Sequence, residues 1–281
     1  MNKMNPIFFY IKDKLKDLYQ ERELSSIIKI ILTDIFSMST IEIYGGKDKF
    51  FSSKEMAELD VIIERLKKNE PIQYILGYEI FYGLKYKVTE NVLIPRPETA
   101  ELVEWIISYS EGKSGKIIDI GTGSGCIAIS LAANIPGVSV EGWDISQEAL
   151  NVASYNAKLN NVDVTFRNVD ILSFSSDGEK YDVIVSNPPY ITEAEKDDMQ
   201  SNVLEWEPFT ALFVNNSDPL LFYRKIAQVG IDSLLPDGRI YFEINRSFFK
   251  EIVAMLEEYG YRDIEVRKDC FGNERMVKAR L

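Results

Sequence analysis

Short apolar runs alternate with helical patterns from Lys116 to the end of the chain, and this alternation constrains the fold most strongly. The predicted strands span residues 116–120, 138–143, 162–167, 181–185, 239–244, 264–268 and 275–281. The predicted helices among them span residues 126–133, 147–159, 220–234 and 248–259. This alternation is typical of an α/β fold with a doubly wound, mostly parallel sheet, here of seven strands. Such sheets bind ligands beyond the carboxyl ends of their strands.

The first 97 residues have a different character. Residues 1–70 carry apolar side chains at three- and four-residue spacing, which predicts a small N-terminal helical bundle. Its helices are expected to begin near Ser25 or Ser26 and near Ser52 or Ser53, because serine often caps a helix. Residues 71–97 alternate polar and apolar side chains around Gly83, which predicts a β-hairpin linker to a domain of residues 98–281.

Composition excludes several classes of function. The chain has no histidine and only two cysteines, so the usual general base and the usual metal ligands are absent and no metal site is predicted. The net charge is −12, which does not suit a partner bound through its phosphates, so no direct nucleic-acid partner is expected. No apolar run approaches the ~20 residues of a membrane span. We expect a cytoplasmic protein without a membrane partner.

A glycine-rich loop follows the predicted strand at residues 116–120. Its candidate cofactor-binding residues are Asp119, Gly121, Thr122, Gly123, Ser124 and Gly125. Glycines let the backbone turn sharply and let a ligand approach closely. A dinucleotide fingerprint would need glycine where Cys126 stands, which counts against a NAD-linked oxidoreductase. The G-x-G-x-G spacing, with an acidic residue two positions before it, resembles the first motif of class I methyltransferases, which bind S-adenosylmethionine.

Acidic residues follow the next strands, where such a cofactor would need hydrogen-bond acceptors. Asp144 could accept from both ribose hydroxyls, and Asp170 from the adenine amino group, with Ile171 against the ring. Asp119 could bind the methionine ammonium directly or through water. Each carboxylate alone is more often a helix cap or a solvated charge. Their places at successive strand ends favour the cofactor site, to which Asn187 is also assigned.

The predicted strand at residues 181–185 leads into Asn187-Pro188-Pro189-Tyr190. The prolines make this loop stiff, since each fixes its own φ. The Asn187 side-chain oxygen and the Pro188 carbonyl could accept the two hydrogens of a planar NH2 group, and Tyr190 could pack on that group. An ordinary proline turn is the alternative. We assign Asn187, Pro188 and Tyr190 as catalytic residues.

The tetrapeptide resembles the loop of amino-methyltransferases that alkylate DNA adenine, ribosomal RNA guanine or protein glutamine. A strong base is not needed, because the proton becomes acidic once the nitrogen is alkylated. The candidate substrate-binding residues are Asn187, Pro188, Pro189, Tyr190 and Arg96, the last held between two prolines.

Several motifs occur in the same order as in one family. They are Pro71–Gly77, Leu93–Thr99, the glycine loop, Asn187–Ile191, Glu207-Pro208 with Ala211-Leu212, and Asn273–Arg275. From about residue 71 the chain closely resembles the release-factor glutamine methyltransferases of the HemK/PrmC type. Ala100 and Asn245 depart from that family's pattern, at positions away from the proposed chemistry.

The resemblance implies N5-methylation of the glutamine in the Gly-Gly-Gln motif of peptide chain release factors, a step in translation termination. S-adenosylmethionine would be the donor and S-adenosylhomocysteine the product. The helical domain would help to hold the release factor, and a monomer is expected. Alternatives are a methyltransferase for glutamine in a ribosomal protein, a DNA or RNA amino-methyltransferase, and a non-catalytic protein that binds S-adenosylmethionine. A nucleic-acid enzyme would be expected to carry a basic recognition region.

Overall fold

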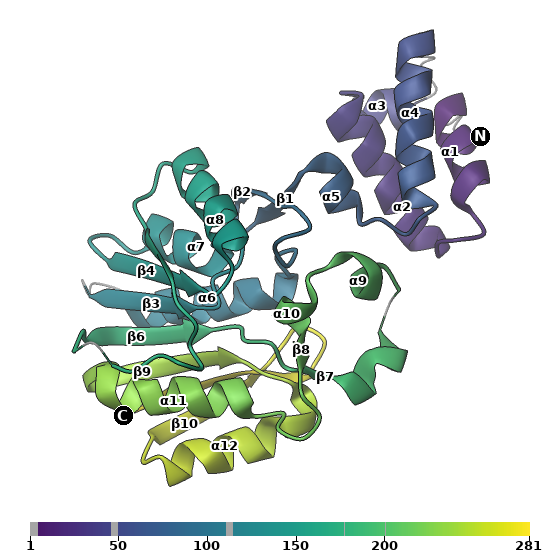
Figure 1. The fold of residues 1–281 in the computed structure, drawn as a ribbon. Coiled ribbons are helices and arrows are strands. Elements are labelled where there is room, and N and C mark those ends of the chain that lie inside the picture. Colours follow the sequence, from purple (N-terminus) through teal and green to yellow (C-terminus); the bar gives the residue numbers. More distant parts are fainter. Residues whose placement is uncertain (1–4, 46–49, 111–114, 177, 200) are drawn as a thin grey trace. The chain divides into compact units, whose positions relative to one another are not determined.

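The computed structural model describes residues 5–45, 50–110, 115–176, 178–199 and 201–281, which form two compact units (Figure 1). The smaller unit holds the chain up to Leu76 together with Ser201–Trp206, and the larger holds Gly77–Gln200 and Glu207–Leu281. The division therefore falls between Leu76 and Gly77, whereas the helical domain was expected to end at residue 70. Residues 1–4, 46–49 and 111–114 of the expected domains lie outside the described residues.

The smaller unit is helical throughout its described residues. Its elements are α1 (Pro6–Leu15), α2 (Glu21–Ile30), a π-helical turn (Ile31–Ile35), α3 (Thr40–Tyr44), α4 (Ser53–Leu66), α5 (Ile72–Leu76) and α9 (Ser201–Trp206). Ile11, Leu15, Ile28 and Leu59 are completely buried in its core. In α4 the buried residues Leu59, Ile62, Ile63 and Leu66 follow the three- and four-residue spacing from which the bundle was predicted.

Two predicted helix starts have different outcomes. Helix α2 begins at Glu21, so the start predicted at Ser25 or Ser26 is wrong. The hydroxyl of Ser25 donates to the carbonyl of Glu21 at 2.8 Å, an in-helix bond that serine forms as readily as a cap. The start of α4 is confirmed, since the Ser52 side chain accepts from the Glu55 N–H and the Glu55 carboxylate accepts from the Ser52 N–H.

Helix α9 comes from a much later part of the chain than the rest of its unit. The indole Nε1 of Trp206 donates to the Lys68 carbonyl at 3.0 Å. The Asn69 side chain donates to the Ser201 hydroxyl at 3.3 Å. These bonds connect the end of α4 to a segment more than 130 residues away, and no local pattern predicts such a pairing.

The larger unit is built on the expected seven-stranded sheet. Its strands are β3 (Lys116–Ile120), β4 (Ser139–Asp144), β5 (Thr165–Asn168), β6 (Tyr181–Ser186), β9 (Leu234–Glu243), β10 (Arg262–Lys268) and β11 (Glu274–Arg280). They lie in the order β10-β11-β9-β6-β3-β4-β5, and only β11 runs antiparallel to its neighbours. The predicted hairpin is present as β1 (Tyr78–Phe81) and β2 (Leu84–Lys87).

Helices cover both faces of the sheet (Figure 1). One face packs against α6 (Pro97–Ser110), α7 (Cys126–Asn134) and α8 (Gln147–Leu159), and the other against α11 (Leu221–Ser233) and α12 (Phe249–Glu258). Neighbours along β3 alternate between the faces, with Ile117 in one core and Ile118 in the other. Among the helices in the described part of the chain, none has the length and apolar character that a membrane crossing requires.

The shorter elements of this unit lie after β6 and β9. They are β7 (Ile191–Thr192), a 3₁₀ turn at Glu193–Asp198, α10 (Phe209–Leu212), β8 (Phe213–Val214) and a 3₁₀ turn at Arg246–Phe248. Strands β7 and β8 pair in parallel as a separate small sheet. None of these elements was predicted, because each is too short to show a periodic pattern.

Strand order places the two predicted motifs side by side. The chain leaves β3 towards β4 and β5 on one side and returns to β6 on the other, so strand order reverses between β3 and β6. Ile120 at the end of β3 is in register with Ser186 at the end of β6. The Ser186 hydroxyl donates to the Ile120 carbonyl at 2.6 Å. The glycine loop and the Asn-Pro-Pro segment therefore begin next to each other, at the usual place for a ligand in such sheets.

Gly125, the cap of α7, combines a left-handed backbone with tight surroundings. Its φ is +80°, and an added Cβ would lie 2.8 Å from Ile129 Cδ1 and 3.1 Å from Ala153 Cβ. Gly260 has a similar φ of +83° but open space around it. We expect Gly260→Ala to cost about 1–2 kcal/mol of unfolding free energy from backbone strain alone. Gly125→Ala is expected to cost about 1 kcal/mol or more beyond that, because the added methyl group overpacks the loop.

Urea unfolding of both variants, followed by tryptophan fluorescence, checks this difference. Equal losses in the two variants would mean that the contacts around Gly125 relax without cost.

Candidate active site

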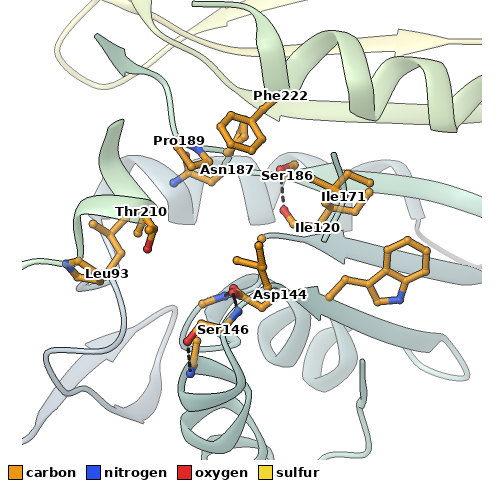
Figure 2. Close-up of a pocket in the computed structure, with 18 of the residues that line it drawn as sticks. Leu93, Ile120, Asp144, Ser146, Ile171, Ser186, Asn187, Pro189, Thr210 and Phe222 are labelled. Carbon is orange, nitrogen blue, oxygen red and sulfur yellow. Dashed lines mark hydrogen bonds between the residues drawn. The ribbon is translucent and has the colours of Figure 1, made fainter. Parts of the chain in front are cut away.

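A cavity of about 470 Å³ lies at the carboxyl ends of β3, β4 and β6 (Figure 2). Five segments contribute most of its wall, namely Ile120 with Gly121 and Gly123, Trp143–Ser146, Val169–Leu172, Ser186–Pro189 and Pro208–Ala211. The first four follow successive strands of the parallel sheet, which is why they converge. The volume lies in the range of pockets that hold a cofactor or a small ligand.

Backbone hydrogen bonds hold the glycine loop against the end of β4. The N–H groups of Gly121 and Thr122 donate to the Trp143 carbonyl at 2.8 and 2.9 Å. Gly121 and Gly123 have φ values of +75° and +54°, which glycine adopts without strain. Gly142 on β4 leaves room for this loop, since a Cβ there would lie 2.9 Å from the Thr122 hydroxyl.

The predicted loop residues divide into two groups. Gly121 and Gly123 line the cavity, while Asp119, Thr122, Ser124 and Gly125 do not. Thr122 and Ser124 are buried beneath the loop. The Ser124 carbonyl accepts from the Asn156 side chain at 2.9 Å, which ties the loop to α8. This second group therefore supports the surface that the two glycines present.

Asp119 is completely buried under the loop. Its Oδ2 accepts from the Thr122 hydroxyl at 2.6 Å and from the Ala128 N–H at 3.3 Å. Its Oδ1 has no hydrogen-bond partner among the described residues. Burial raises the pKa of Asp119 to about 7. A cationic group near Oδ1 would favour the ionised carboxylate. Asp119 does not line the cavity, so its contact with the methionine ammonium stays a prediction.

Asp144 lines the cavity at the end of β4 and is held by backbone groups on both sides. Its Oδ2 accepts from the Gly123 N–H at 2.8 Å, and its Oδ1 accepts from the Ser146 N–H at 2.9 Å. Burial raises the pKa of Asp144 above its ordinary value, while these hydrogen bonds favour the ionised form. Each carboxylate oxygen keeps a second lone pair, so Asp144 can accept hydrogen bonds from two neighbouring hydroxyls.

Asp170 and Ile171 also line the cavity, after β5. Asp170 Oδ1 accepts from the Leu172 N–H at 2.9 Å, which fixes the side chain in a tight turn. Ile171 and Ile120 lie close together in Figure 2, on the side of the cavity away from Leu93. These residues provide an apolar wall beside a carboxylate, the environment expected for a heteroaromatic ring that carries an amino group.

The Asn-Pro-Pro segment lines the cavity across from the glycine loop. Asn187 Nδ2 donates to the Thr99 hydroxyl at 3.4 Å. Among the described residues, none donates a hydrogen bond to the Pro188 carbonyl. Phe222, at the start of α11, lies beside Asn187 and Pro189 in Figure 2. The segment therefore presents two acceptors, the Asn187 side-chain oxygen and the Pro188 carbonyl, next to an aromatic ring.

Tyr190 and Arg96 do not line this cavity. The Tyr190 hydroxyl donates to Glu243 Oε1 at 3.2 Å, and its ring packs in the core beside α11. The Arg96 guanidinium forms an ion pair with Glu207, whose side chain is 1% exposed. Tyr190 and Arg96 therefore contact Glu243 and Glu207, which do not line the cavity either. A direct contact of Tyr190 or Arg96 with substrate stays a prediction.

Several residues of the site were not identified from sequence. Leu93, Pro208–Ala211, Phe213 and Phe222 line the cavity. The sequence predicts no role for the Glu207-Pro208 motif. In the structure the Glu207 carboxylate pairs with the Arg96 guanidinium and accepts from the Ile94 N–H, which holds the segment that begins at Pro208. Asn245, expected to lie away from the chemistry, donates to the Tyr190 carbonyl at 3.1 Å. That contact joins residues 55 positions apart, and no local sequence pattern predicts it.

Two protein-family models and several known proteins match this chain. Residues 99–205 match the family model Methyltransferase small domain, and residues 10–77 match PrmC N-terminal domain. A release factor glutamine methyltransferase of Bacteroides thetaiotaomicron is 49% identical over 279 residues, which are 98% of this chain and 99% of that protein. One of Flavobacterium psychrophilum is 46% identical over 94% of each chain. The crystal structure of a methyltransferase from Pyrococcus furiosus has a TM-score of 0.52 at 18% identity, over 79% of this chain and 98% of that one. This last likeness concerns the fold alone.

Proposed function

The chain belongs to the release factor glutamine methyltransferase family, and on this premise we propose that it methylates the N5 nitrogen of a release-factor glutamine. The glutamine is that of the Gly-Gly-Gln motif in peptide chain release factors. The methyl donor is S-adenosylmethionine, which supplies a methyl group on a positively charged sulfur. Such a substrate belongs to translation termination, so we also propose a cytoplasmic location.

The residues of the cavity suit this donor. The carboxylates of Asp144 and Asp170 are acceptors for ribose hydroxyls and for an adenine amino group. Ile120 and Ile171 provide the apolar wall for the ring. Gly121 and Gly123 carry no side chain, so the backbone can approach the donor closely. These contacts come from the three segments that follow β3, β4 and β5 in one cavity wall.

The observation that carries the proposal is the pair of acceptors on the Asn-Pro-Pro segment. A glutamine amide has two N–H donors and a delocalised lone pair, so its nitrogen is a weak nucleophile. The Asn187 side-chain oxygen and the Pro188 carbonyl can accept those two hydrogens at the edge of the same cavity. These hydrogen bonds hold the nitrogen facing the glycine loop and strengthen as positive charge develops on it. The proton then leaves to solvent without a strong base.

We also propose that the helical unit helps to hold the release factor. Phe9, Leu18, Ile41 and Val61 are large apolar side chains that this unit leaves at least half exposed. Exposed apolar side chains of this size can take part in binding another protein.

Mass spectrometry of a purified release factor tests the proposal directly. The factor is incubated with the protein and S-adenosylmethionine, digested, and its Gly-Gly-Gln peptide examined. We expect a mass gain of about 14 daltons, one CH2 group, on that glutamine. If ribosomal protein or nucleic acid gains the methyl group instead, the chain has a different substrate with the same NH2 chemistry. No transfer to any of these, despite cofactor binding, would leave a non-catalytic binding protein.

A further inference from the structure

Thr99, Glu243 and Asn187 form a hydrogen-bonded chain behind the cavity, although they are far apart in sequence. The Thr99 hydroxyl, in the first turn of α6, donates to Glu243 Oε2 at 2.6 Å. Asn187 Nδ2 donates to the same hydroxyl oxygen at 3.4 Å. Thr99 and Glu243 are each 2% exposed, and neither lines the cavity. Of the three residues in this chain, Asn187 is therefore the one that can touch a substrate in the cavity.

The direction of these hydrogen bonds follows from the chemistry of the groups. An ionised carboxylate only accepts, so the single hydrogen of the Thr99 hydroxyl must point to Glu243. The oxygen of Thr99 can then only accept from a third group. Of the two ends of the Asn187 amide, only the NH2 end can donate. If the amide were reversed, two oxygens would face each other without a hydrogen between them.

We propose that Thr99 and Glu243 are positioning residues that orient the Asn187 amide, so that its oxygen and not its NH2 group faces the substrate. This inference rests on the proposed function, because it explains how the glutamine NH2 group always meets an acceptor. A reversed Asn187 would present hydrogens to hydrogens and could not hold the substrate. Glu243 thus acts on Asn187 through two hydrogen bonds, and on the reacting nitrogen through a third.

The other groups around the Glu243 carboxylate are compatible with its accepting the Thr99 hydrogen bond. Its second oxygen, Oε1, accepts from the Tyr190 hydroxyl at 3.2 Å. Burial raises the pKa of Glu243, while the Thr99 hydrogen bond and the nearby Arg275 guanidinium favour its ionised form. Arg275 itself pairs with Asp269 at 3.1 Å. Each oxygen of Glu243 therefore has a fixed inward partner, which keeps the Thr99 hydrogen directed towards it.

Thr99→Val removes the hydroxyl and keeps the shape of the side chain. We expect it to lower kcat about tenfold, the effect of one lost orienting hydrogen bond, while the Kd for S-adenosylmethionine stays within about threefold. Thr99→Ser restores a hydroxyl and should recover most of the activity. Glu243→Gln should fall between them, because its NH2 group can reverse the Thr99 hydrogen bond. Wild-type kcat in Thr99→Val would overturn the inference.

The same substitution in an Asn187→Ala background separates positioning from damage to the fold. If Thr99 acts only through Asn187, Thr99→Val should cause no further loss of kcat in that background. An equal loss in both backgrounds would overturn the inference. Ser130→Ala is a matched control, since it removes another buried hydroxyl, bonded to Tyr86 at 2.8 Å and outside the site. It should lower thermal stability without changing kcat.

A measurement without substrate keeps the inference testable if the proposed function fails. In protein labelled with ¹⁵N-asparagine, the Asn187 NH2 resonances are identified by their loss in Asn187→Ala. Thr99→Val and Glu243→Gln should shift these resonances, whereas Ser130→Ala should not. Unshifted resonances would overturn the positioning role. Absence of release-factor methylation by the wild type, with shifted resonances, would reject the proposed substrate and leave the orientation of Asn187 supported.

Discussion

Asn187→Ala is expected to lower kcat for glutamine methylation by about 10²- to 10³-fold, the range seen when one group that stabilises developing charge is removed. The side-chain oxygen of Asn187 is one of the two acceptors available to the substrate NH2 group, so its loss frees the nitrogen to rotate. Binding of S-adenosylmethionine should change by less than about threefold, because Gly121, Gly123 and Asp144 still line the cavity. The variant should therefore bind donor normally and turn over slowly.

Single-turnover kinetics and calorimetry together check this prediction. Asn151→Ala, which removes an exposed asparagine of α8, is the matched control and should behave as wild type. Turnover of Asn187→Ala at the wild-type rate would mean that the acceptor mechanism is wrong. A loss explained entirely by weaker donor binding would assign Asn187 to the cofactor alone.

Asp144→Ala is expected to weaken the binding of S-adenosylmethionine by about 10- to 100-fold, or about 1.4–2.8 kcal/mol. The substitution removes the acceptor for the ribose hydroxyls. It also leaves the N–H groups of Gly123 and Ser146 without the oxygens that they now contact at 2.8 and 2.9 Å. The glycine loop should become less well ordered, which adds an entropic cost to binding.

Isothermal titration calorimetry gives the change in Kd. Asp163→Ala removes the same charge from an exposed position before β5 and should leave the Kd unchanged. An unaltered Kd in Asp144→Ala would reject the ribose role. A rise in Kd of equal size in both variants would point to long-range electrostatics in place of direct contact.

The fold could be predicted closely where a segment carries its own pattern. Helix α8 has the bounds expected from its Ser146 cap, and β3 spans the expected Lys116–Ile120. Strand β9 begins at Leu234, five residues before the predicted start at residue 239. Its first half contains Pro236, Asp237 and Gly238, residues that favour turns. The register with β6 shifts between the pairs at Leu234 and Arg239, and Asp237 has a φ of +65°, so this stretch is an irregularity within the strand. Regular pairing begins at Arg239, the predicted start.

The site could be predicted only as far as its local motifs reach. The glycine loop and Asn187-Pro188 are each part of a short sequence motif at the end of a predicted strand. They lie next to each other because their strands, β3 and β6, are neighbours in the sheet. Thr99 and Glu243 are 144 positions apart, and their contact depends on how α6 packs against β9. Tyr190 is the last residue of the Asn-Pro-Pro-Tyr motif, yet its hydroxyl points away from the cavity and donates to Glu243. The direction of a side chain depends on its neighbours in space, which adjacency in sequence does not reveal.

Helix α9 has a consequence for the order in which this protein is made. The smaller unit is composed of the chain up to Leu76 and of Ser201–Trp206, so its last helix is synthesised long after the others. A nascent chain that has emerged only to Leu76 lacks the indole that bonds to Lys68. Domains generally fold in order of synthesis, but this one stays incomplete until most of the sheet-forming strands have left the ribosome. Cutting the gene between Leu76 and Gly77 would therefore leave the smaller unit without α9, whereas the fragment from Gly77 onward would keep every segment of the larger unit.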